Sequence, residues 1–425
     1  MEGCGIGMYI KRAIEDVIEI TNKGFKAVLV TGARQVGKST LLKHLYNGHR
    51  YITFDDPVLL SETRKEPGLF FRNYKPPMIL DEVQYISELF PYIKMECDKV
   101  DDKGLFQLTG SQQYQMMKNV SESLAGRVAI LELAGLSLRE MRADTFRQPF
   151  IPSENYINER GKTAKVCDHL WEIIHRGGYP ALADKNVDWQ TFFSSYVQTY
   201  IDRDINDLAN VKNKLKFTQF LTVMASRTGQ MLNYAAIAEQ LEISASTVKE
   251  WISLLEASGI VYILQPFSNS SLNRVIKTPK LYFRDTGLVC YLAKYPTADT
   301  AMNGAMAGEL FETFVVSEIL KSFSNAGLDY RMYVTYYRGK DKIRRRRNGE
   351  RTEQEAEIDL MIEQGDTIYP VEIKLSANPK LSMTNAFDVI DKISGKNRGN
   401  GTIVCMYESV QWLNERTVAV PVEYI

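Results

Sequence analysis

Residues 32–39, with the sequence GARQVGKS, restrict this chain to a small set of folds because they satisfy the pattern G-x-x-x-x-G-K-[ST] at every fixed position. They follow the apolar run AVLV at 27–30 and precede a segment with apolar side chains at helical spacing. A glycine-rich turn between a buried strand and a helix lets backbone N–H groups surround a phosphate, and the helix N-terminus adds its positive dipole end. The pattern therefore predicts an α/β domain that binds a nucleoside triphosphate.

The pattern also predicts a role for individual residues of this loop. Lys38 is expected to reach the oxygens of the β and γ phosphates, and the hydroxyl of Ser39 is expected to ligate Mg²⁺. The expected cofactors are therefore ATP and Mg²⁺. The residues predicted to contact the nucleotide are Gly32, Ala33, Arg34, Gln35, Val36, Gly37, Lys38, Ser39 and Thr40.

A second motif, MILDE at residues 78–82, joins a short apolar run to two carboxylates. In a P-loop ATPase, the first carboxylate of such a motif helps to hold Mg²⁺ and the second polarises the attacking water. We therefore predict these roles for Asp81 and Glu82, and Glu82 indicates a hydrolase rather than a passive binder. The alternative is a strand that ends in a solvated acidic turn, which the neighbouring P-loop motif disfavours.

Two further positions are predicted to act on the γ phosphate. The apolar run at 105–108 leads into Thr109 and Ser111, and either hydroxyl could sense this phosphate. Arg127 precedes the apolar run at 128–133, and an arginine there could stabilise the transition-state charge in a neighbouring subunit. That role would require a homo-oligomer. The alternative is a solvated surface arginine.

The motifs GARQVGKST, ILDEVQ, LTGS and LAGR together resemble those of bacterial and archaeal AAA-type ATPases that carry a C-terminal domain of the DUF4143 type. The resemblance extends over nearly the whole chain. It implies an ATPase core at residues 1–138, a helical lid and linker at 139–214, a winged helix-turn-helix at 215–300, and a domain similar to PD-(D/E)XK nucleases at 301–425. It does not imply that members of the family cut a substrate.

The overall charge is balanced, with 52 lysine and arginine residues against 52 aspartate and glutamate residues. The net charge therefore does not draw the protein onto nucleic acid or anionic lipid. The five cysteines show no C-x-x-C spacing, which argues against a zinc site or a disulfide framework. Since no apolar run approaches the ~20 residues that span a bilayer, and no signal-peptide core is present, we expect a cytoplasmic protein without a membrane partner.

The segment RGGYP at residues 176–180 interrupts the helical pattern of the lid. Its Gly-x-Pro resembles the element that touches the nucleotide base in related signalling and origin-binding ATPases. By this resemblance, Pro180 is a candidate base contact and Arg176 a candidate phosphate sensor. The alternative is a simple helix stop, since glycine and proline end helices without any ligand.

Three helical segments at 217–226, 234–241 and 247–258, followed by an apolar strand at 260–264, are typical of a winged helix-turn-helix. The third helix is the candidate for reading DNA. Lys249 is its only cation, against Glu250 and Glu256, whereas phosphate contacts usually supply much of the affinity for DNA. A structural or protein-contacting role is therefore a strong alternative.

A second chemical constellation lies towards the C-terminus. Glu312 falls in an acidic helical segment, Asp359 in an apolar strand, and Glu372 and Lys374 in the strand VEIK at 371–374. Residues two apart in a strand share a face, so Glu372 and Lys374 are expected beside Asp359 on a neighbouring strand. The carboxylates are predicted to hold Mg²⁺ or Mn²⁺, and Lys374 to activate the attacking water. This spacing resembles that of PD-(D/E)XK nucleases.

The basic run KDKIRRRRNGER at 340–351 is expected at a hairpin tip, where it either tracks phosphates or is merely solvated. Two function classes therefore remain open. In the first, ATP binding and hydrolysis gate a nuclease that acts on DNA or RNA. In the second, the chain is a nucleotide-dependent switch whose inactive nuclease-like domain binds nucleic acid or protein. Only the first class requires Asp359, Glu372 and Lys374 together.

Overall fold

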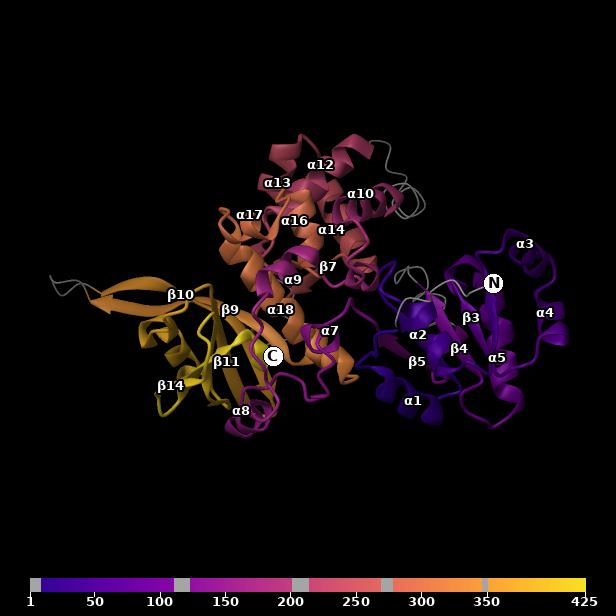
Figure 1. Ribbon diagram of the computed structural model, residues 1–425, viewed down its shortest axis with the longest axis horizontal. Coiled ribbons are helices and arrows are strands. Elements are labelled where there is room, and N and C mark those ends of the chain that lie inside the picture. Colours follow the sequence, from indigo (N-terminus) through magenta and orange to yellow (C-terminus); the bar gives the residue numbers. More distant parts are fainter. Residues whose placement is uncertain (1–8, 111–122, 201–213, 269–277, 346–350) are drawn as a thin grey trace.

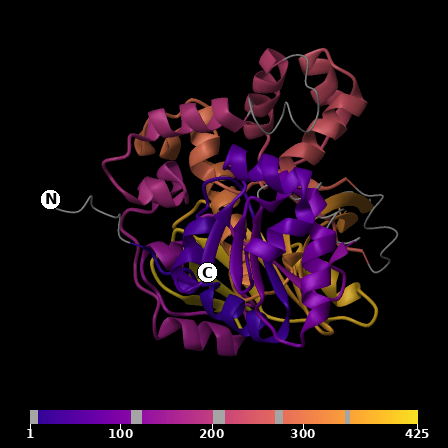
Figure 2. The same ribbon diagram turned by 90° about the vertical axis from the view of Figure 1, so that its right-hand side faces the viewer.

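The computed structural model describes residues 9–110, 123–200, 214–268, 278–345 and 351–425, with the backbone alone for 340–345 and 351–354. The chain forms three lobes (Figure 1). An N-terminal lobe with a parallel sheet and a C-terminal lobe with a larger sheet lie at opposite ends of the long axis, and a helical lobe stands above and between them. Viewed from the N-terminal side, the first lobe lies in front of the C-terminal sheet (Figure 2).

The N-terminal lobe is built on a parallel sheet with the strand order β2-β3-β4-β1-β5, which confirms the predicted α/β class. Alternate residues of β1 pack into two different hydrophobic clusters, one on each face, so the strand is buried throughout. The strands are β1 (Ala27–Thr31), β2 (Arg50–Thr53), β3 (Met78–Asp81), β4 (Phe106–Gly110) and β5 (Val128–Glu132). The helices are α1 (Glu15–Gly24), α2 (Lys38–Leu45), α3 (Pro57–Lys65), α4 (Pro67–Asn73) and α5 (Phe90–Lys99).

The helical lobe contains a compact group of helices and a small antiparallel sheet of order β6-β8-β7. Its elements follow the chain order α12 (Lys214–Ala225), β6 (Gln230–Met231), α13 (Tyr234–Leu241), α14 (Ala245–Ala257), β7 (Val261–Leu264), β8 (Lys280–Phe283), α16 (Thr286–Leu292) and α17 (Ala298–Met302). A connecting segment leads to this lobe from β5. It carries α7 (Leu138–Met141), α8 (Glu154–Gly161), α9 (Leu170–Arg176), the 3-10 turn η3 (Pro180–Ala183) and α10 (Trp189–Tyr200).

The C-terminal lobe pairs one long helix with a mixed sheet of order β14-β15-β13-β11-β10-β9, in which β12 also pairs with β11. The β9–β10 hairpin projects away from the body of the molecule (Figure 1) and carries residues 340–345 and 351 of the basic run. Residues 346–350, and the side chains of the rest of this run, lie outside the described part. The elements are α18 (Ala307–Asn325), β9 (Val334–Arg345), β10 (Arg351–Gln364), β11 (Thr367–Lys374), β12 (Asn397–Arg398), β13 (Gly401–Cys405), β14 (Gln411–Asn414) and β15 (Thr417–Pro421).

Helix α18 contacts the helical lobe, the sheet of its own lobe and the connecting segment. It is buried around most of its circumference, as expected for a helix that is surrounded by protein. It packs against β8 of the helical lobe and β11 of its own sheet. Near its end, the Lys321 ammonium donates to the carbonyl of Leu136 at 3.0 Å, and the Glu318 carboxylate accepts from the N–H of Leu138 at 2.8 Å. The helix therefore holds the segment that directly follows β5.

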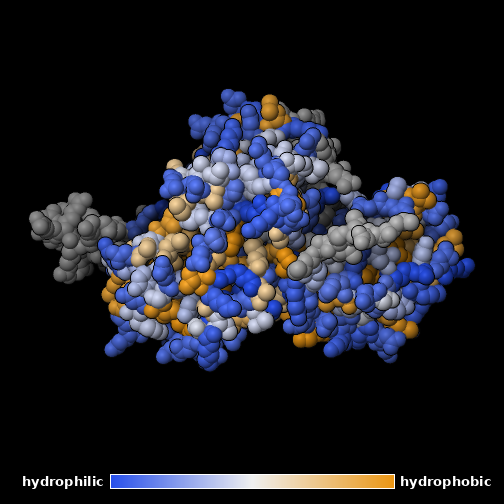
Figure 3. Space-filling view, in the orientation of Figure 1, coloured by the Kyte–Doolittle hydropathy of each residue, from blue (hydrophilic) through white to orange (hydrophobic). Residues whose placement is uncertain are grey.

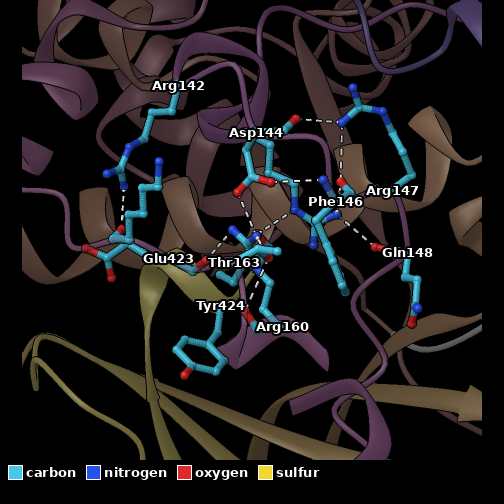
Figure 4. Close-up of polar contacts among 12 residues, drawn as sticks. Arg142, Asp144, Phe146, Arg147, Gln148, Arg160, Thr163, Glu423 and Tyr424 are labelled. Atoms are coloured by element: carbon cyan, nitrogen blue, oxygen red, sulfur yellow. Dashed lines mark hydrogen bonds and ion pairs between the residues drawn. The ribbon is translucent and has the colours of Figure 1, made fainter. Parts of the chain in front are cut away.

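Arginines of the connecting segment fasten residues 423–425 (Figure 4). Arg160 in α8 donates to the carbonyl of Glu423 at 2.6 and 3.0 Å, and it pairs with the carboxylate of Asp144 at 2.6 Å. Arg139 in α7 donates to the carbonyl of Ile425 at 2.8 Å. Because these guanidinium groups are largely buried, their donors need such partners. The bonds hold the connecting segment against the C-terminal lobe.

Hydrophilic residues cover most of the face shown in Figure 3, with smaller groups of hydrophobic residues between them. Within the described residues, no helix combines the length and the apolar character that crossing a membrane requires.

Candidate nucleotide site and C-terminal carboxylate site

The P-loop follows β1 at the carboxyl edge of the parallel sheet. Gly32 and Gly37 have φ angles of +142° and +94°, and a Cβ on Gly32 would collide with the carbonyl oxygen of Leu133, so the loop requires glycine there. Lys38 is the first residue of α2, and its ammonium donates to the carbonyls of Gly32 at 3.1 Å and Ala33 at 2.8 Å. The lysine thus lies inside the curve of the loop, where a phosphate would be cradled.

Asp81 lies at the centre of a hydrogen-bonded group beside the P-loop. The hydroxyl of Ser39 donates to its Oδ1 at 2.7 Å, and Thr109 donates to the same oxygen. The N–H of Glu82 donates to the Thr109 hydroxyl at 3.1 Å. The structure therefore brings together the side chains of the predicted Mg²⁺ ligands and of one predicted phosphate sensor, with the backbone of Glu82 beside them. The alternative sensor, Ser111, lies outside the described residues.

Tyr51 on β2 belongs to this group, although no sequence motif indicated it. Its hydroxyl donates to Oδ2 of Asp81 at 2.5 Å. Burial, followed by this hydrogen bond, raises the pKa of Tyr51, so the hydroxyl stays protonated and remains a donor. The contact arises because β2 pairs in parallel with β3, with Thr53 opposite Asp81, and a sequence pattern does not reveal that register.

Glu82 adopts a φ of +58°, in the left-handed region that residues other than glycine rarely occupy. Its carboxylate accepts a hydrogen bond from the side-chain amide of Gln84. Residues held in this conformation cost about 1–3 kcal/mol and cluster at functional sites. The unusual backbone therefore marks Glu82 as a candidate functional residue.

Arg12, to which no sequence motif assigned a role, holds the backbone of the P-loop. Its guanidinium donates to the carbonyls of Val36 at 2.9 Å and Ala134 at 2.7 Å, and it pairs with Glu140 at 3.0 Å. Both charged side chains are almost fully buried, at 4% and 1% exposure. Burial alone raises the pKa of Glu140, but Arg12 and two backbone N–H donors outweigh burial and leave that pKa lowered. The pair joins the P-loop to the start of the connecting segment.

Pro180 lies beside the P-loop, whereas Arg176 does not face it. A Cβ placed on Gly37 would stand 3.7 Å from the ring of Pro180. Arg176 instead donates to the carbonyls of Leu182 at 2.6 Å and Asp184 at 2.9 Å, which closes the turn that contains the proline. The predicted base contact is therefore near the nucleotide site, and the arginine of this segment has a local structural partner.

The helical lobe also touches the P-loop directly. A Cβ placed on Gly259, between α14 and β7, would lie 3.1 Å from the backbone nitrogen of Ala33. Arg284, which follows β8, pairs with Glu132 at the end of β5. The P-loop therefore lies where the N-terminal and helical lobes meet.

Arg127 lies at the opposite edge of the parallel sheet from the P-loop. Its carbonyl accepts from the N–H of Ala27 at 3.1 Å, at the start of β1, and its guanidinium forms a two-point pair with Asp98 at 2.6 and 3.0 Å. It is therefore directed away from the nucleotide site of its own chain. Action on a neighbouring chain stays a prediction, and it would require Asp98 to release the guanidinium.

The predicted C-terminal residues come together on the face of the sheet next to α18. Lys374 Nζ lies 2.7 Å from Glu372 Oε1 and 3.6 Å from Asp359 Oδ2, and the N–H of Ile373 donates to Asp359 Oδ2 at 2.9 Å. The antiparallel register of β10 and β11 sets Leu360 opposite Val371 and so brings these carboxylates close.

Two residues of β8 complete this group, and the sequence analysis missed both. The Tyr282 hydroxyl donates to Glu312 Oε1 at 2.6 Å. Lys280 Nζ lies 2.6 Å from Glu357 Oε1, 3.7 Å from Glu312 Oε1 and 3.9 Å from Asp359 Oδ1. Among the residues that the structure describes, no three Asp, Glu, His or Cys side chains converge closely enough to hold a metal ion. As arranged, the predicted metal ligands Glu312, Asp359 and Glu372 therefore surround lysine ammonium groups.

Two carboxyls of this group, those of Glu312 and Glu372, have raised pKa values. Burial, followed by the negative charge of Asp359, raises the pKa of Glu312 to about 7 and that of Glu372 to about 8. In Glu372 the neighbouring Lys374 offsets only part of this effect. Perturbed carboxyls of this kind are typical of functional sites, although structural ion-pair groups also produce them.

We expect the stability of the protein to fall with rising pH because of these carboxyls. The folded chain keeps protons that the unfolded chain releases near pH 4.5, so the contribution is complete below that pH and is lost towards pH 8. In urea unfolding at pH 5.5 and 8.5, wild type should lose more free energy of unfolding than Glu372→Gln. The exposed Glu415→Gln should behave as wild type does, and equal losses in wild type and Glu372→Gln would contradict the raised pKa.

The parallel sheet and the P-loop after β1 define an α/β domain of the P-loop type. Family models match three parts of the chain. Residues 24–142 match the family model described as an AAA domain, and residues 307–425 match the domain of unknown function DUF4143. Residues 167–299, from α9 to α17, match a further domain of unknown function, DUF8612. By these matches, residues 24–142 are similar to AAA domains and residues 307–425 to DUF4143 domains.

The relatives found by sequence are uncharacterized proteins. One from Mycobacterium tuberculosis is 28% identical over 367 residues, covering 86% of this chain and 74% of the relative. One from Methanocaldococcus jannaschii is 22% identical over 307 residues, covering 64% of this chain and 63% of the relative.

Two solved structures show some likeness to this chain at low sequence identity. A Walker-type ATPase of Pyrococcus abyssi shares 15% identity over 65% of this chain and 94% of its own, with a TM-score of 0.38. The RuvB Holliday junction branch migration motor of Thermotoga maritima shares 17% identity over 59% of this chain and 85% of its own, with a TM-score of 0.27. TM-scores this low do not establish a shared overall fold.

Proposed function

We propose that this protein binds ATP with Mg²⁺ and hydrolyses it, and that the nucleotide sets the position of a winged helix and a nuclease-like C-terminal domain. The single observation that supports hydrolysis most directly is the group around Asp81. Ser39 and Thr109 both donate to this carboxylate, and Glu82 follows it at the position expected for polarising water.

The described contacts suggest a role for each residue. Lys38 would neutralise the β and γ phosphates, while Ser39 and Asp81 would hold Mg²⁺, which supplies further positive charge to the phosphates. Glu82 would orient the attacking water and accept its proton. Arg127 of a neighbouring chain would add a cation at the transition state, so the proposal includes a homo-oligomer. Pro180 would contact the base.

Coupling to the other lobes is supported by the contacts around the P-loop. The order of elements from α12 to β8 is helix, strand, helix, helix, strand, strand, as in a winged helix. This lobe reaches the nucleotide site through Gly259 and the pair between Arg284 and Glu132. Helix α18 holds the segment after β5 through Glu318 and also presents Glu312 to the C-terminal carboxylates. A nucleotide that moves the P-loop would therefore act on both lobes.

A second candidate function, metal-dependent cleavage of DNA or RNA, concerns the C-terminal lobe. It is favoured by Glu372, whose Oε2 is buried and has no hydrogen-bond partner. A buried oxygen of this kind is costly unless a ligand occupies its free position. Asp359 and Glu372 would hold Mg²⁺ or Mn²⁺ with help from Glu312, and Lys374 would stand beside the water.

The competing proposal is a nucleotide-dependent switch whose C-terminal lobe binds nucleic acid or protein without cutting it. Two observations favour it. The ammonium of Lys280 lies among the carboxylates, where a metal ion would be needed for cleavage. Lys249, the cation of α14, lies over the ring of Tyr234 at 5.3 Å and so has a partner within the protein. Cleavage of plasmid and single-stranded DNA or RNA with Mg²⁺ or Mn²⁺, with and without ATP, separates the two. Cutting that is lost in Asp359→Ala supports the nuclease, and ATP turnover without cutting supports the switch.

A cytoplasmic location is part of the proposal. The described cysteines are free rather than disulfide-bonded, as is usual in a reducing compartment. They are Cys97, Cys167, Cys290 and Cys405.

Nucleotide binding is tested by Lys38→Ala. The variant loses a charged contact to phosphate worth about 1.5–3 kcal/mol, so the dissociation constant for ATP should rise by about ten- to a hundredfold. Isothermal titration calorimetry with ATP and Mg²⁺ measures it. Lys65→Ala, at an exposed position at the end of α3, is the matched control and should bind as wild type does. Equal affinity of Lys38→Ala and wild type would refute the proposed site.

A further inference from the structure

The cation among the C-terminal carboxylates comes from a different lobe. Lys280 is the first residue of β8 in the helical lobe, yet its ammonium points into the C-terminal lobe and is only 5% exposed. It lies 2.6 Å from Glu357, 3.7 Å from Glu312 and 3.9 Å from Asp359. The site is therefore shared between two lobes, and its resident cation can leave if the lobes separate.

The charges of this group do not balance. Four carboxylates, those of Glu312, Glu357, Asp359 and Glu372, surround two ammonium groups, those of Lys280 and Lys374, so two negative charges remain when all are ionised. Buried carboxyls in such a group, here Glu312 and Glu372, keep a proton unless a further cation offsets the excess negative charge. The excess would be met by a divalent cation.

Glu372 is an independent sign that a ligand is missing from the group. The residue is 8% exposed, and while its Oε1 receives the ammonium of Lys374 at 2.7 Å, its Oε2 is buried without a hydrogen-bond partner. Native structures rarely leave such an atom unsatisfied, and a bound ion is one of the accepted explanations.

The ammonium of Lys280 lies beside two of the carboxylates that would ligate a metal ion, Glu312 and Asp359. A divalent cation lies about 2.0–2.6 Å from its oxygen ligands. Lys280 Nζ lies 3.7 Å from Glu312 and 3.9 Å from Asp359, so a metal ion bound by these two carboxylates would have to come closer to them than the ammonium does. An ammonium and a divalent ion cannot share this space. With the ammonium in place, no three acidic side chains of the described chain converge on one point.

We propose that Lys280 acts as a removable plug in a divalent-cation site built by Glu312, Asp359 and Glu372, and that Mn²⁺ or Mg²⁺ binds there only when β8 withdraws the lysine. This inference rests on the proposed metal-dependent role of the C-terminal lobe and is independent of ATP hydrolysis.

The same strand connects the plug to the nucleotide site. Arg284 follows Lys280 by four positions, about 13 Å along an extended strand, and pairs with Glu132 at the end of β5. Glu132 lies opposite Thr31, the residue before the P-loop. A shift of the P-loop that pulls on this pair would move β8 along its own direction and withdraw Lys280 from the carboxylates.

Titration of the full-length, nucleotide-free protein with Mn²⁺, followed by the electron paramagnetic resonance signal of free Mn²⁺, tests the plug. Lys280→Met keeps the length of the side chain without its charge and should bind Mn²⁺ at least tenfold more tightly than wild type. Lys280→Arg keeps the charge and should resemble wild type. Adding Glu372→Gln to Lys280→Met should return the Mn²⁺ affinity to that of wild type or below.

Equal Mn²⁺ affinity in Lys280→Met and wild type would overturn the inference, whether both proteins bind the ion or neither does. A gain that survives Glu372→Gln would place the ion elsewhere and would also overturn it. Lys280→Gln is the second variant if Lys280→Met does not fold, because its amide can still donate to Glu357. ATP turnover of each preparation reports on the proposed ATPase separately, so a failure of one proposal is distinguished from a failure of the other.

Discussion

Replacement of Glu82 by glutamine is expected to lower the rate of ATP hydrolysis by about 10²–10⁴-fold and to leave ATP binding nearly unchanged, because it removes only the base that accepts the proton of water. Glutamine preserves the shape of the side chain and can still contact the amide of Gln84. The P-loop, Ser39 and Asp81 are untouched by the change. Binding energy should therefore persist while the transition state loses its stabilisation.

Single-turnover release of phosphate measures hydrolysis in this variant, and binding of ATP is measured in parallel by calorimetry. Glu88→Gln, at an exposed position a few residues along the chain, is the matched control and should retain wild-type turnover. If Glu82→Gln turns over ATP as fast as wild type, Glu82 is not the catalytic base. If it no longer binds ATP, the residue shapes the site rather than the chemistry.

Among the variants proposed for this protein, Arg12→Met is expected to lower the free energy of unfolding the most. The substitution leaves the Glu140 carboxylate buried without its partner, and breaking one side of a buried ion pair typically costs about 3–5 kcal/mol. It also releases the carbonyls of Val36 and Ala134 from their donor. The P-loop should then become less ordered, so the affinity for ATP should fall together with the free energy of unfolding.

Urea unfolding and ATP titration of the same preparations test this expectation. Lys11→Met, at the exposed neighbouring position, should leave both quantities unchanged. The double variant Arg12→Met/Glu140→Met should recover part of the lost stability, because it removes the stranded charge as well. A loss below about 1 kcal/mol in Arg12→Met would mean that the backbone N–H donors alone satisfy Glu140.

The motifs of the candidate nucleotide site can be recognised in the sequence because they are short and local. GARQVGKS needs only the preceding strand and the following helix to form a phosphate cradle, and the acidic pair at Asp81 and Glu82 ends the neighbouring buried strand. The chemistry that each motif predicts therefore depends on only a few consecutive residues. Tyr51 and Arg12 carry no such signal, since each reaches the site across a strand pairing or a lobe contact.

In the C-terminal group as well, local sequence patterns predicted some neighbours and tertiary packing decided the others. Strand alternation predicted that Glu372 and Lys374 share a face, and the structure places them 2.7 Å apart. The partnership of Lys280 with Glu357, on strands of different lobes, follows from no periodicity or motif. The sequence predicted a metal site of three carboxylates, and it could not reveal that the ammonium of Lys280 lies among them.

The amino-acid sequence by itself determined the α/β class, the P-loop and the acidic pair of the ATPase domain, because hydrophobic periodicity and contiguous motifs act over a few residues. Only the tertiary structure decided what surrounds those motifs. It put Arg12 behind the loop, turned Arg127 towards Asp98 at the far edge of the sheet, and brought Lys280 to the C-terminal carboxylates. The physical reason is that buried charges must find partners, and the packing of distant elements selects which partners are within reach.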